Sequence, residues 1–122
     1  MQPRDAQILR HIAEYCEDIA RCLKETGLSH ERFLSDTIIQ HSVAFCILQI
    51  GELVARLSEE FRLRTGGEMN WAAIKGMRNI VVHDYGSIDR EELWITAAQD
   101  VPVLRQFCET YREDPPDTVE EC

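Results

Sequence analysis

The strongest constraint on the fold is the spacing of apolar residues, which recur every three or four positions along almost the whole chain. The N-terminal segment shows the pattern most clearly, at Ile8, Ile12, Tyr15, Ile19 and Leu23. This spacing places the apolar side chains on one face of an α-helix. Only six Gly and four Pro occur in 122 residues, too few for the frequent turns of a β-sandwich or barrel. The pattern therefore predicts an all-α protein.

Helix-terminating residues divide the first half of the chain into segments. Pro3 suits the first turn of a helix and Gly27 suits its C-terminal stop, so we expect one helix between them. After a connector near residues 27–30, the apolar pattern predicts a long helix over residues 31–64. Asp36 is a good N-cap residue, and it could divide this long segment by starting a new helix.

The second half of the chain predicts two further helices. Residues 65–67 end the long segment, and Asn70 is a good N-cap for a helix that should stop near residues 85–86. Asp89 is expected to open the last helix, in which Pro102 should produce a kink or a break. The expected fold is an up-and-down bundle of four to five helices.

Length and charge distribution predict one domain with a tail. A chain of 122 residues lies at the commonest single-domain size, and we expect residues 1–111 to form that domain. Residues 112–122 read REDPPDTVEEC, with one Arg against five acidic residues and two of the four Pro. This composition predicts a flexible acidic tail.

The balance of charge limits the kinds of partner. Thirteen Lys and Arg against 22 Asp and Glu give a net charge of −9, which excludes a strongly basic nucleic-acid binder at the level of the whole chain. The sign reverses over residues 56–78, where five basic residues face three acidic ones. A phosphate-bearing partner should therefore meet the middle of the chain.

The five cysteines predict reduced thiols rather than disulfides. Their number is odd, no C-x-x-C pair occurs, and four of them lie within the helical apolar pattern. No signal peptide opens the chain, and no uninterrupted apolar run reaches the ~20 residues of a membrane span. We expect a cytoplasmic protein without membrane association, in which the cysteines act as small core residues.

Residues 43–48, VAFCIL, run without a polar residue in the middle of the expected long helix. A helix that is apolar all round is buried on two sides. In a chain of this size one side is the bundle core, and the other is expected to be a second subunit. The run therefore predicts a homodimer.

The residues that a bundle uses to hold metals are missing. A di-iron bundle needs Glu-x-x-His pairs, and none of the four His residues has Glu three positions before it. Residues 66–67 are a Gly-Gly pair, but the Lys-Ser/Thr of a phosphate-binding loop does not follow. We expect neither a metal nor a cofactor.

The chemically distinctive segment is residues 71–85, WAAIKGMRNIVVHDY, which contains Arg78-x-x-x-x-His83-x-Tyr85. On one continuous helix Arg78 and His83 would lie about 140° apart, so a rigid helix cannot aim both at one atom. Asn79 and His83, four positions apart, would touch. Convergence requires the helix to end near His83, or the same helix from a symmetry-related copy.

These residue types suit RNA cleavage without a metal. An imidazole can take a proton from a ribose 2′-OH or return one to the leaving oxygen. A guanidinium can stabilise the charge that builds on the phosphate, and a phenol can orient either group. Ordinary structural roles are the alternative: Arg78 pairs with an acid, His83 caps a helix, and Tyr85 packs.

Several motifs give the chain a family resemblance. They are I-G-E at residues 50–52, W-x-x-I at 71–74, G-M-R-N at 76–79 and H-D-Y at 83–85. With them, residues 5–107 resemble the HepT-like toxins of the HEPN superfamily, small all-α proteins. The resemblance implies a HEPN-type bundle and a metal-independent endoribonuclease that is the toxin of a toxin–antitoxin pair. It also implies a homodimer with an interfacial cleft and a minimal nucleotidyltransferase as the antitoxin partner.

Residue by residue, the resemblance implies that Arg78 and His83 are the catalytic pair. Tyr85 matches the motif tyrosine, which the partner can modify with AMP (AMPylation), and Asn79 fills a supporting position. Lys75 and Glu52 are candidate residues of the cleft.

Two alternatives remain open. Glu52 either belongs to the cleft or pairs with Arg56 one helical turn away. The chain as a whole is either a nuclease or a non-catalytic helical adaptor, a nucleotide-binding partner of a nucleotidyltransferase that cleaves nothing. The acidic net charge slightly favours the adaptor, whereas the motif favours the nuclease.

Overall fold

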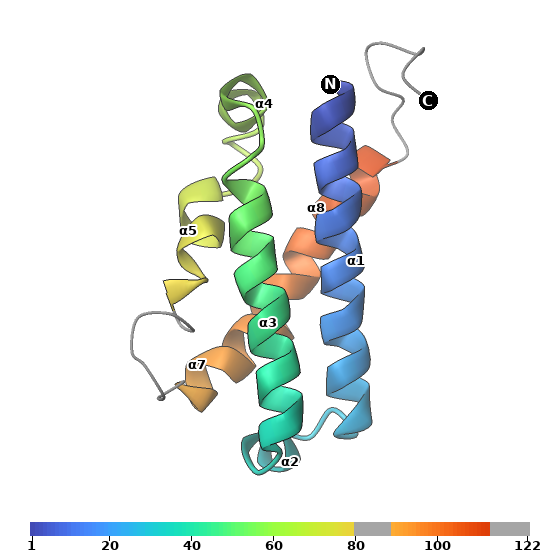
Figure 1. Cartoon of the computed structure of the whole chain (residues 1–122), viewed down its shortest axis with the longest axis vertical. Coiled ribbons are helices and arrows are strands. Elements are labelled where there is room, and N and C mark those ends of the chain that lie inside the picture. The colour runs from blue at the N-terminus through green and yellow to red at the C-terminus, as the bar shows by residue number, and fades with distance from the viewer. Residues whose placement is uncertain (80–88, 113–122) are drawn as a thin grey trace.

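The computed structural model describes residues 1–79 and 89–112, and within them it contains helices and no strands (Figure 1). In chain order the elements are α1 (Pro3–Glu25), α2 (His30–Leu34), α3 (Thr37–Val54), α4 (Glu59–Arg64), α5 (Trp71–Gly76), α7 (Arg90–Ile95), the π-helical turn η1 (Thr96–Asp100) and α8 (Val101–Arg112). The all-α prediction is confirmed.

Three long helices form the body of the bundle. α1 and α3 lie side by side and antiparallel, and α8 packs along α1. α5 packs on α3, while α2 and α7 contact each other near the start of α3 (Figure 1). The fully buried side chains Ile12, Ile19, Ile47, Ile50 and Leu104 come from all three long helices, so they share one apolar core.

Both predicted ends of α1 are confirmed. Pro3 occupies the first turn, where its missing N–H costs no hydrogen bond. Beyond the helix, Gly27 has φ +66°, a left-handed conformation that glycine adopts without strain. The chain can therefore reverse direction within a few residues and enter α2.

The prediction of a single long helix over residues 31–64 is wrong, because three helices occupy this range. Asp36 caps α3 as anticipated, with its Oδ1 accepting from Ile39 N at 3.0 Å. A second break follows α3, where Ser58 caps α4 by accepting from Phe61 N at 3.1 Å. The buried carboxylate of Asp5 accepts from Ser58 N at 2.8 Å and from Ser58 Oγ at 2.6 Å. These bonds hold the break in place.

α5 begins as predicted but ends early. Asn70 Oδ1 accepts from Ala73 N at 3.0 Å, which confirms the cap. The helix that was expected to continue to residues 85–86 ends at Gly76, and Met77 and Arg78 form a turn. Glycine has the lowest helix propensity after proline, which favours this stop. Residues 85–86 lie outside the described residues.

The last helical segment has the predicted cap and the predicted irregularity. Asp89 Oδ1 accepts from Glu92 N at 3.0 Å and starts α7. The π-helical turn η1 comes directly before α8, whose second residue is Pro102. A wider turn at this point relieves the clash between the proline ring and the preceding carbonyl groups. α8 ends at Arg112, so residues 113–122 of the predicted tail lie outside the described residues.

The apolar run at residues 43–48 is buried on one side of α3 only. Val43, Ala44, Cys46 and Ile47 lie in the core, whereas the side chain of Phe45 is 55 % exposed. Seven residues, or about two helical turns, before Phe45, Ile38 is 70 % exposed. Within residues 1–79 and 89–112, the second apolar face of this helix is therefore left exposed at these positions.

α3 is long and apolar enough to cross a membrane by length and composition, with a mean hydropathy of 1.4 over Thr37–Val54. The helix is not an uninterrupted apolar run, because polar residues such as His41 and Glu52 interrupt it, so the expectation from the sequence is not contradicted. The central helix of a bundle passes the same test of length and composition equally well, and 44 % of this helix is buried inside the protein. The absence of membrane association stays a prediction.

The described cysteines behave as core residues. Cys16, Cys46 and Cys108 are buried, and Cys22 is half-buried. Burial raises the pKa of the Cys46 thiol to about 12 and raises the pKa of Cys16 further. Because the thiolate is the reactive form, these side chains act as small hydrophobic groups rather than as nucleophiles.

Candidate functional site

An ion pair joins the Arg78 turn to α3. Arg78 Nη1 donates to Glu52 Oε2 at 2.7 Å, a short, charge-assisted hydrogen bond. Both side chains are partly accessible, at 39 % for Arg78 and 46 % for Glu52. Glu52 thus pairs with Arg78, not with Arg56, while its place in a cleft stays a prediction. Its partner is the arginine that the motif singles out.

Gly51 brings the same turn against the backbone of α3. A Cβ atom built on Gly51 would lie 3.1 Å from Arg78 Cβ and 3.3 Å from the carbonyl oxygen of Lys75. These distances are shorter than ordinary carbon contacts, so a larger residue would force the two segments apart. This role of Gly51 was not predicted from the sequence. The signal was a lone glycine within an otherwise apolar helical pattern.

The other candidate residues divide into two groups. Lys75 and Asn79 are exposed on either side of Arg78, and the backbone carbonyl oxygen of Lys75 lies close to Gly51 of α3. His83 and Tyr85 lie outside the described residues. The structure therefore brings together Arg78, Glu52 and the Lys75 backbone, and the roles of His83 and Tyr85 stay predictions.

The geometry leaves Arg78 able to bind an anion. A guanidinium group carries five N–H donors in a planar fork, and Glu52 receives a bond from one of its nitrogens. The remaining donors belong to a partly exposed side chain, at the end of the segment in which basic residues outnumber acidic ones. A phosphate is the ligand that suits such a fork best.

Within residues 1–79 and 89–112, no three or more His, Cys, Asp or Glu residues form a group that could hold a metal ion. Of the described histidines, His30 bonds to Glu91 at 3.0 Å and His11 to Glu14 at 3.3 Å, and each is a simple pair. The absence of a metal remains a prediction for the chain as a whole.

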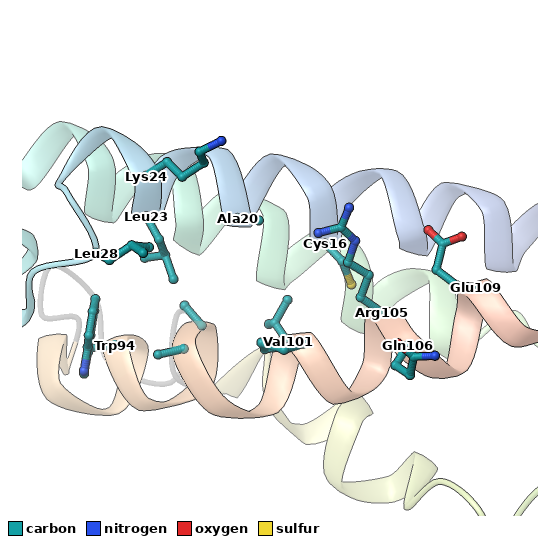
Figure 2. Close-up of a pocket in the computed structure, with 13 residues that line it drawn as sticks. Cys16, Ala20, Leu23, Lys24, Leu28, Trp94, Val101, Arg105, Gln106 and Glu109 are labelled. Carbon is teal, nitrogen blue, oxygen red and sulfur yellow. The ribbon is translucent and has the colours of Figure 1, made fainter.

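A hollow with a volume of about 740 Å³ lies elsewhere, between α1 and the η1–α8 segment (Figure 2). Its walls are mainly apolar and include Leu23, Trp94 and Val101. Arg105 also lines the hollow, and its Nη2 lies 3.9 Å from Glu17 Oε2. Its lining includes no histidine, and its one cysteine, Cys16, has a pKa raised by burial. Lys24 and Glu109 line it as well, but the hollow contains neither Arg78 nor any other residue of the motif.

Comparison with known proteins decides the family. A family model described as "Ribonuclease HepT-like" matches residues 12–111, which include Glu52 and the whole segment from Arg78 to Tyr85. The chain belongs to the HepT-like ribonuclease family. The resemblance drawn from the motifs is thereby confirmed.

Two relatives show how fully HepT-like proteins align with this chain. The protein named "Putative RNase TTE0752", from Caldanaerobacter subterraneus subsp. tengcongensis, is 31% identical over 98 residues, or 80% of this chain and 85% of that protein. "Probable ribonuclease HepT" of Thermococcus cleftensis is 30% identical over 105 residues, or 82% of this chain and 94% of that protein.

A third relative covers still more of the chain. "Putative RNase MJ1216" of Methanocaldococcus jannaschii is 28% identical over 115 residues, which is 93% of each protein. No solved structure was found to match the chain. Family membership and the names of these relatives support a ribonuclease-like function for the HepT-like fold described here.

Proposed function

We propose that this HepT-like protein is a metal-independent endoribonuclease in which Arg78 and His83 cleave RNA at a cleft between two subunits. The observation that carries the proposal is the Arg78 side chain. It is partly exposed, held at 2.7 Å by Glu52, and placed within the motif of a ribonuclease-like family. An arginine with donors to spare at such a position suits a phosphate group.

The proposed reaction needs only the RNA and protein side chains. His83 takes the proton from a ribose 2′-OH, whose oxygen attacks the adjacent phosphorus. The bond from phosphorus to the 5′-oxygen of the next nucleotide breaks, and that oxygen leaves after receiving the proton back from protonated His83. The products are a 2′,3′-cyclic phosphate and a free 5′-hydroxyl. Arg78 stabilises the extra negative charge on the pentavalent phosphate between these states.

The remaining candidate residues have supporting roles in this proposal. Asn79 orients the histidine or the RNA, Tyr85 lies at the mouth of the cleft, and exposed Lys75 attracts the RNA backbone. The basic excess over residues 56–78 supplies phosphate contacts that the acidic chain as a whole does not.

The experiment that tests the proposal is digestion of a short RNA by the purified protein in excess EDTA. We expect cleavage to continue at an unchanged rate, because no step uses a metal. In a second substrate, 2′-O-methyl replaces the hydroxyl at the preferred site only. Cleavage at that bond should stop, because the nucleophile is blocked. Loss of activity in EDTA, or equal cutting of the methylated site, would contradict the mechanism.

The α3 surface supports the proposed homodimer. Ile38, Phe45 and Glu52 are spaced seven residues apart, so they share one face of the helix. The first two are large apolar side chains exposed to solvent, and the third holds Arg78. Two copies that meet along this face would cover Ile38 and Phe45 and bring both Arg78 side chains toward one cleft.

Replacing Phe45 with glutamate should therefore dissociate the dimer. A charge buried in an apolar interface is costly, and we expect a shift from dimer to monomer at micromolar concentration in sedimentation equilibrium. The matched control is Leu63→Glu, because Leu63 on α4 is 76 % exposed and lies off this face. A wild-type protein that is already monomeric, or a control that dissociates while Phe45→Glu stays dimeric, would contradict an α3 interface.

We further propose that the nuclease is a cytoplasmic toxin of the type II or VII kind and that a minimal nucleotidyltransferase antitoxin neutralises it. Family membership supports this pairing. The adaptor remains the competing function, favoured by the net charge of −9. Growth arrest on expression of the chain alone supports the toxin, whereas a purified protein that binds the nucleotidyltransferase but cuts no RNA supports the adaptor.

A further inference from the structure

Two consecutive residues of α3 contact Arg78 in two different ways. Gly51 lies under the Arg78 Cβ, and Glu52 receives a hydrogen bond from the end of the same side chain. Arg78 itself lies in a turn, because α5 ends at Gly76. A regular helix therefore does not fix the direction of this arginine, and its position depends on what it packs against.

The contact at Gly51 fixes the base of the side chain. Gly51 is buried, and a Cβ at this position would lie 3.1 Å from Arg78 Cβ and 3.3 Å from the Lys75 carbonyl oxygen, both closer than ordinary contacts. A side chain at position 51 would therefore push the turn and α3 apart by a few tenths of an ångström, and glycine allows the closer approach.

The contact at Glu52 fixes the other end of the side chain. The 2.7 Å bond to Nη1 sets the direction of a planar, rigid group, so it orients the remaining donors. The carboxylate also has a cost, since its negative charge repels an RNA phosphate that approaches Arg78. If Glu52 weakens RNA binding in this way and still supports cleavage, its benefit must come from a step other than binding.

We propose that Glu52 is a positioning residue for Arg78 and that Gly51 sets the distance between α3 and the Arg78 turn. The inference rests on the proposed ribonuclease function. It adds that the direction of the guanidinium, and not only its charge, determines the rate. Glu52 does not touch the RNA in this scheme; it acts through Arg78.

The test measures kcat and KM separately for Glu52→Ala and Glu52→Gln on a short RNA with one cleavage site. Both variants remove the repelling charge, so KM should fall about threefold in each. Glu52→Ala also releases the guanidinium, and kcat should fall about tenfold or more. In Glu52→Gln the amide oxygen still accepts the hydrogen bond, so kcat should recover most of its value. A purely structural role would not lower both constants together.

A matched control and a second variant keep the test decisive. The matched control is Glu14→Gln. Glu14 is exposed and its carboxylate bonds to His11, so this change should leave kcat and KM unchanged. Gly51→Ala should lower kcat with little change in KM, because it displaces Arg78 without altering charge. All variants are assayed below the onset of their own thermal unfolding, which is recorded by circular dichroism. Gly51→Ala therefore provides the kcat readout even if Glu52→Ala is poorly folded.

The outcomes separate this inference from the function on which it rests. A wild-type protein that cleaves RNA, with an unchanged kcat in Glu52→Ala or in Gly51→Ala, overturns the positioning role and leaves the nuclease intact. A rise in KM for Glu52→Ala at constant kcat also overturns it, because that result marks a direct RNA contact. A wild-type protein that does not cleave overturns both.

Discussion

Replacing Arg78 or His83 with alanine should reduce the single-turnover rate of RNA cleavage by about 10²- to 10³-fold or more. Loss of one group that stabilises transition-state charge typically costs about 10²- to 10³-fold. Loss of a general acid–base group costs about 10²- to 10⁴-fold. The measurement uses a labelled RNA with excess enzyme and EDTA, so that product release and metal contamination do not contribute.

Arg78→Lys distinguishes charge from geometry. Lysine keeps the positive charge but offers a point-like ammonium in place of a planar fork, so it should recover only a small part of the lost rate. The control is Arg21→Ala, because Arg21 is an exposed residue of α1 whose Nη1 lies 3.8 Å from Asp18 Oδ1. Full activity in Arg78→Ala would show that the arginine has only a structural role. Its ion pair with Glu52 is compatible with such a role.

The double variant tests whether the two residues act as a unit. Side chains that serve one transition state give losses that do not add, so Arg78→Ala combined with His83→Ala should cost little more than the worse single variant. A loss equal to the product of the two single effects would indicate that the residues act in separate steps or at separate sites.

Features of the fold that depend on neighbouring residues could be predicted from the sequence. Asp36, Asn70 and Asp89 each cap a helix through a backbone N–H three residues away, and a bond of that range is visible in the sequence. The break after α3 could not be predicted in this way. Ser58 is held by the buried carboxylate of Asp5, which is 53 positions away in the chain, and only the packing of α1 on α3 and α4 brings them together.

The same distinction between local and long-range contacts applies to the candidate site. The motif identified Arg78, but the local alternative for Glu52 was Arg56, one helical turn away. The actual partner is 26 positions away and becomes available because α5 ends at Gly76. Gly51 contributes only the space that it leaves empty, and the sequence alone does not show which residue fills that space.

The apolar run of α3 shows what a sequence pattern can predict about an interface when only one subunit is described. Its composition predicted burial on two sides, and the described chain buries one of them. The exposed Phe45 lies seven residues, or about two helical turns, from Glu52 on the same face. An interface along this face and the proposed catalytic cleft would therefore be parts of one surface, and a variant that breaks the dimer should also lower cleavage.

Co-expression with a minimal nucleotidyltransferase, the antitoxin partner proposed above, should place AMP on Tyr85 and abolish RNA cleavage. The tyrosine oxygen attacks the α-phosphorus of ATP, the bond to the β-phosphate breaks, and pyrophosphate leaves with the phenolic proton taken by water. Tyr85 follows His83 by two positions and precedes Gly86, so we expect it at the mouth of the cleft. The new phosphodiester carries about one negative charge and a bulky nucleoside.

Two effects of this AMP group would act on the same arginine. Its phosphate can accept hydrogen bonds from the donors of Arg78 that Glu52 leaves unused, so the modified tyrosine competes with RNA for the guanidinium. The nucleoside occludes the approach. Intact-mass measurement should show an increment of one or more AMP units that disappears in Tyr85→Phe and persists in Tyr15→Phe, a half-buried tyrosine on α1. A neutralised protein of unmodified mass would contradict AMPylation and indicate that the partner blocks the cleft by forming a stable complex.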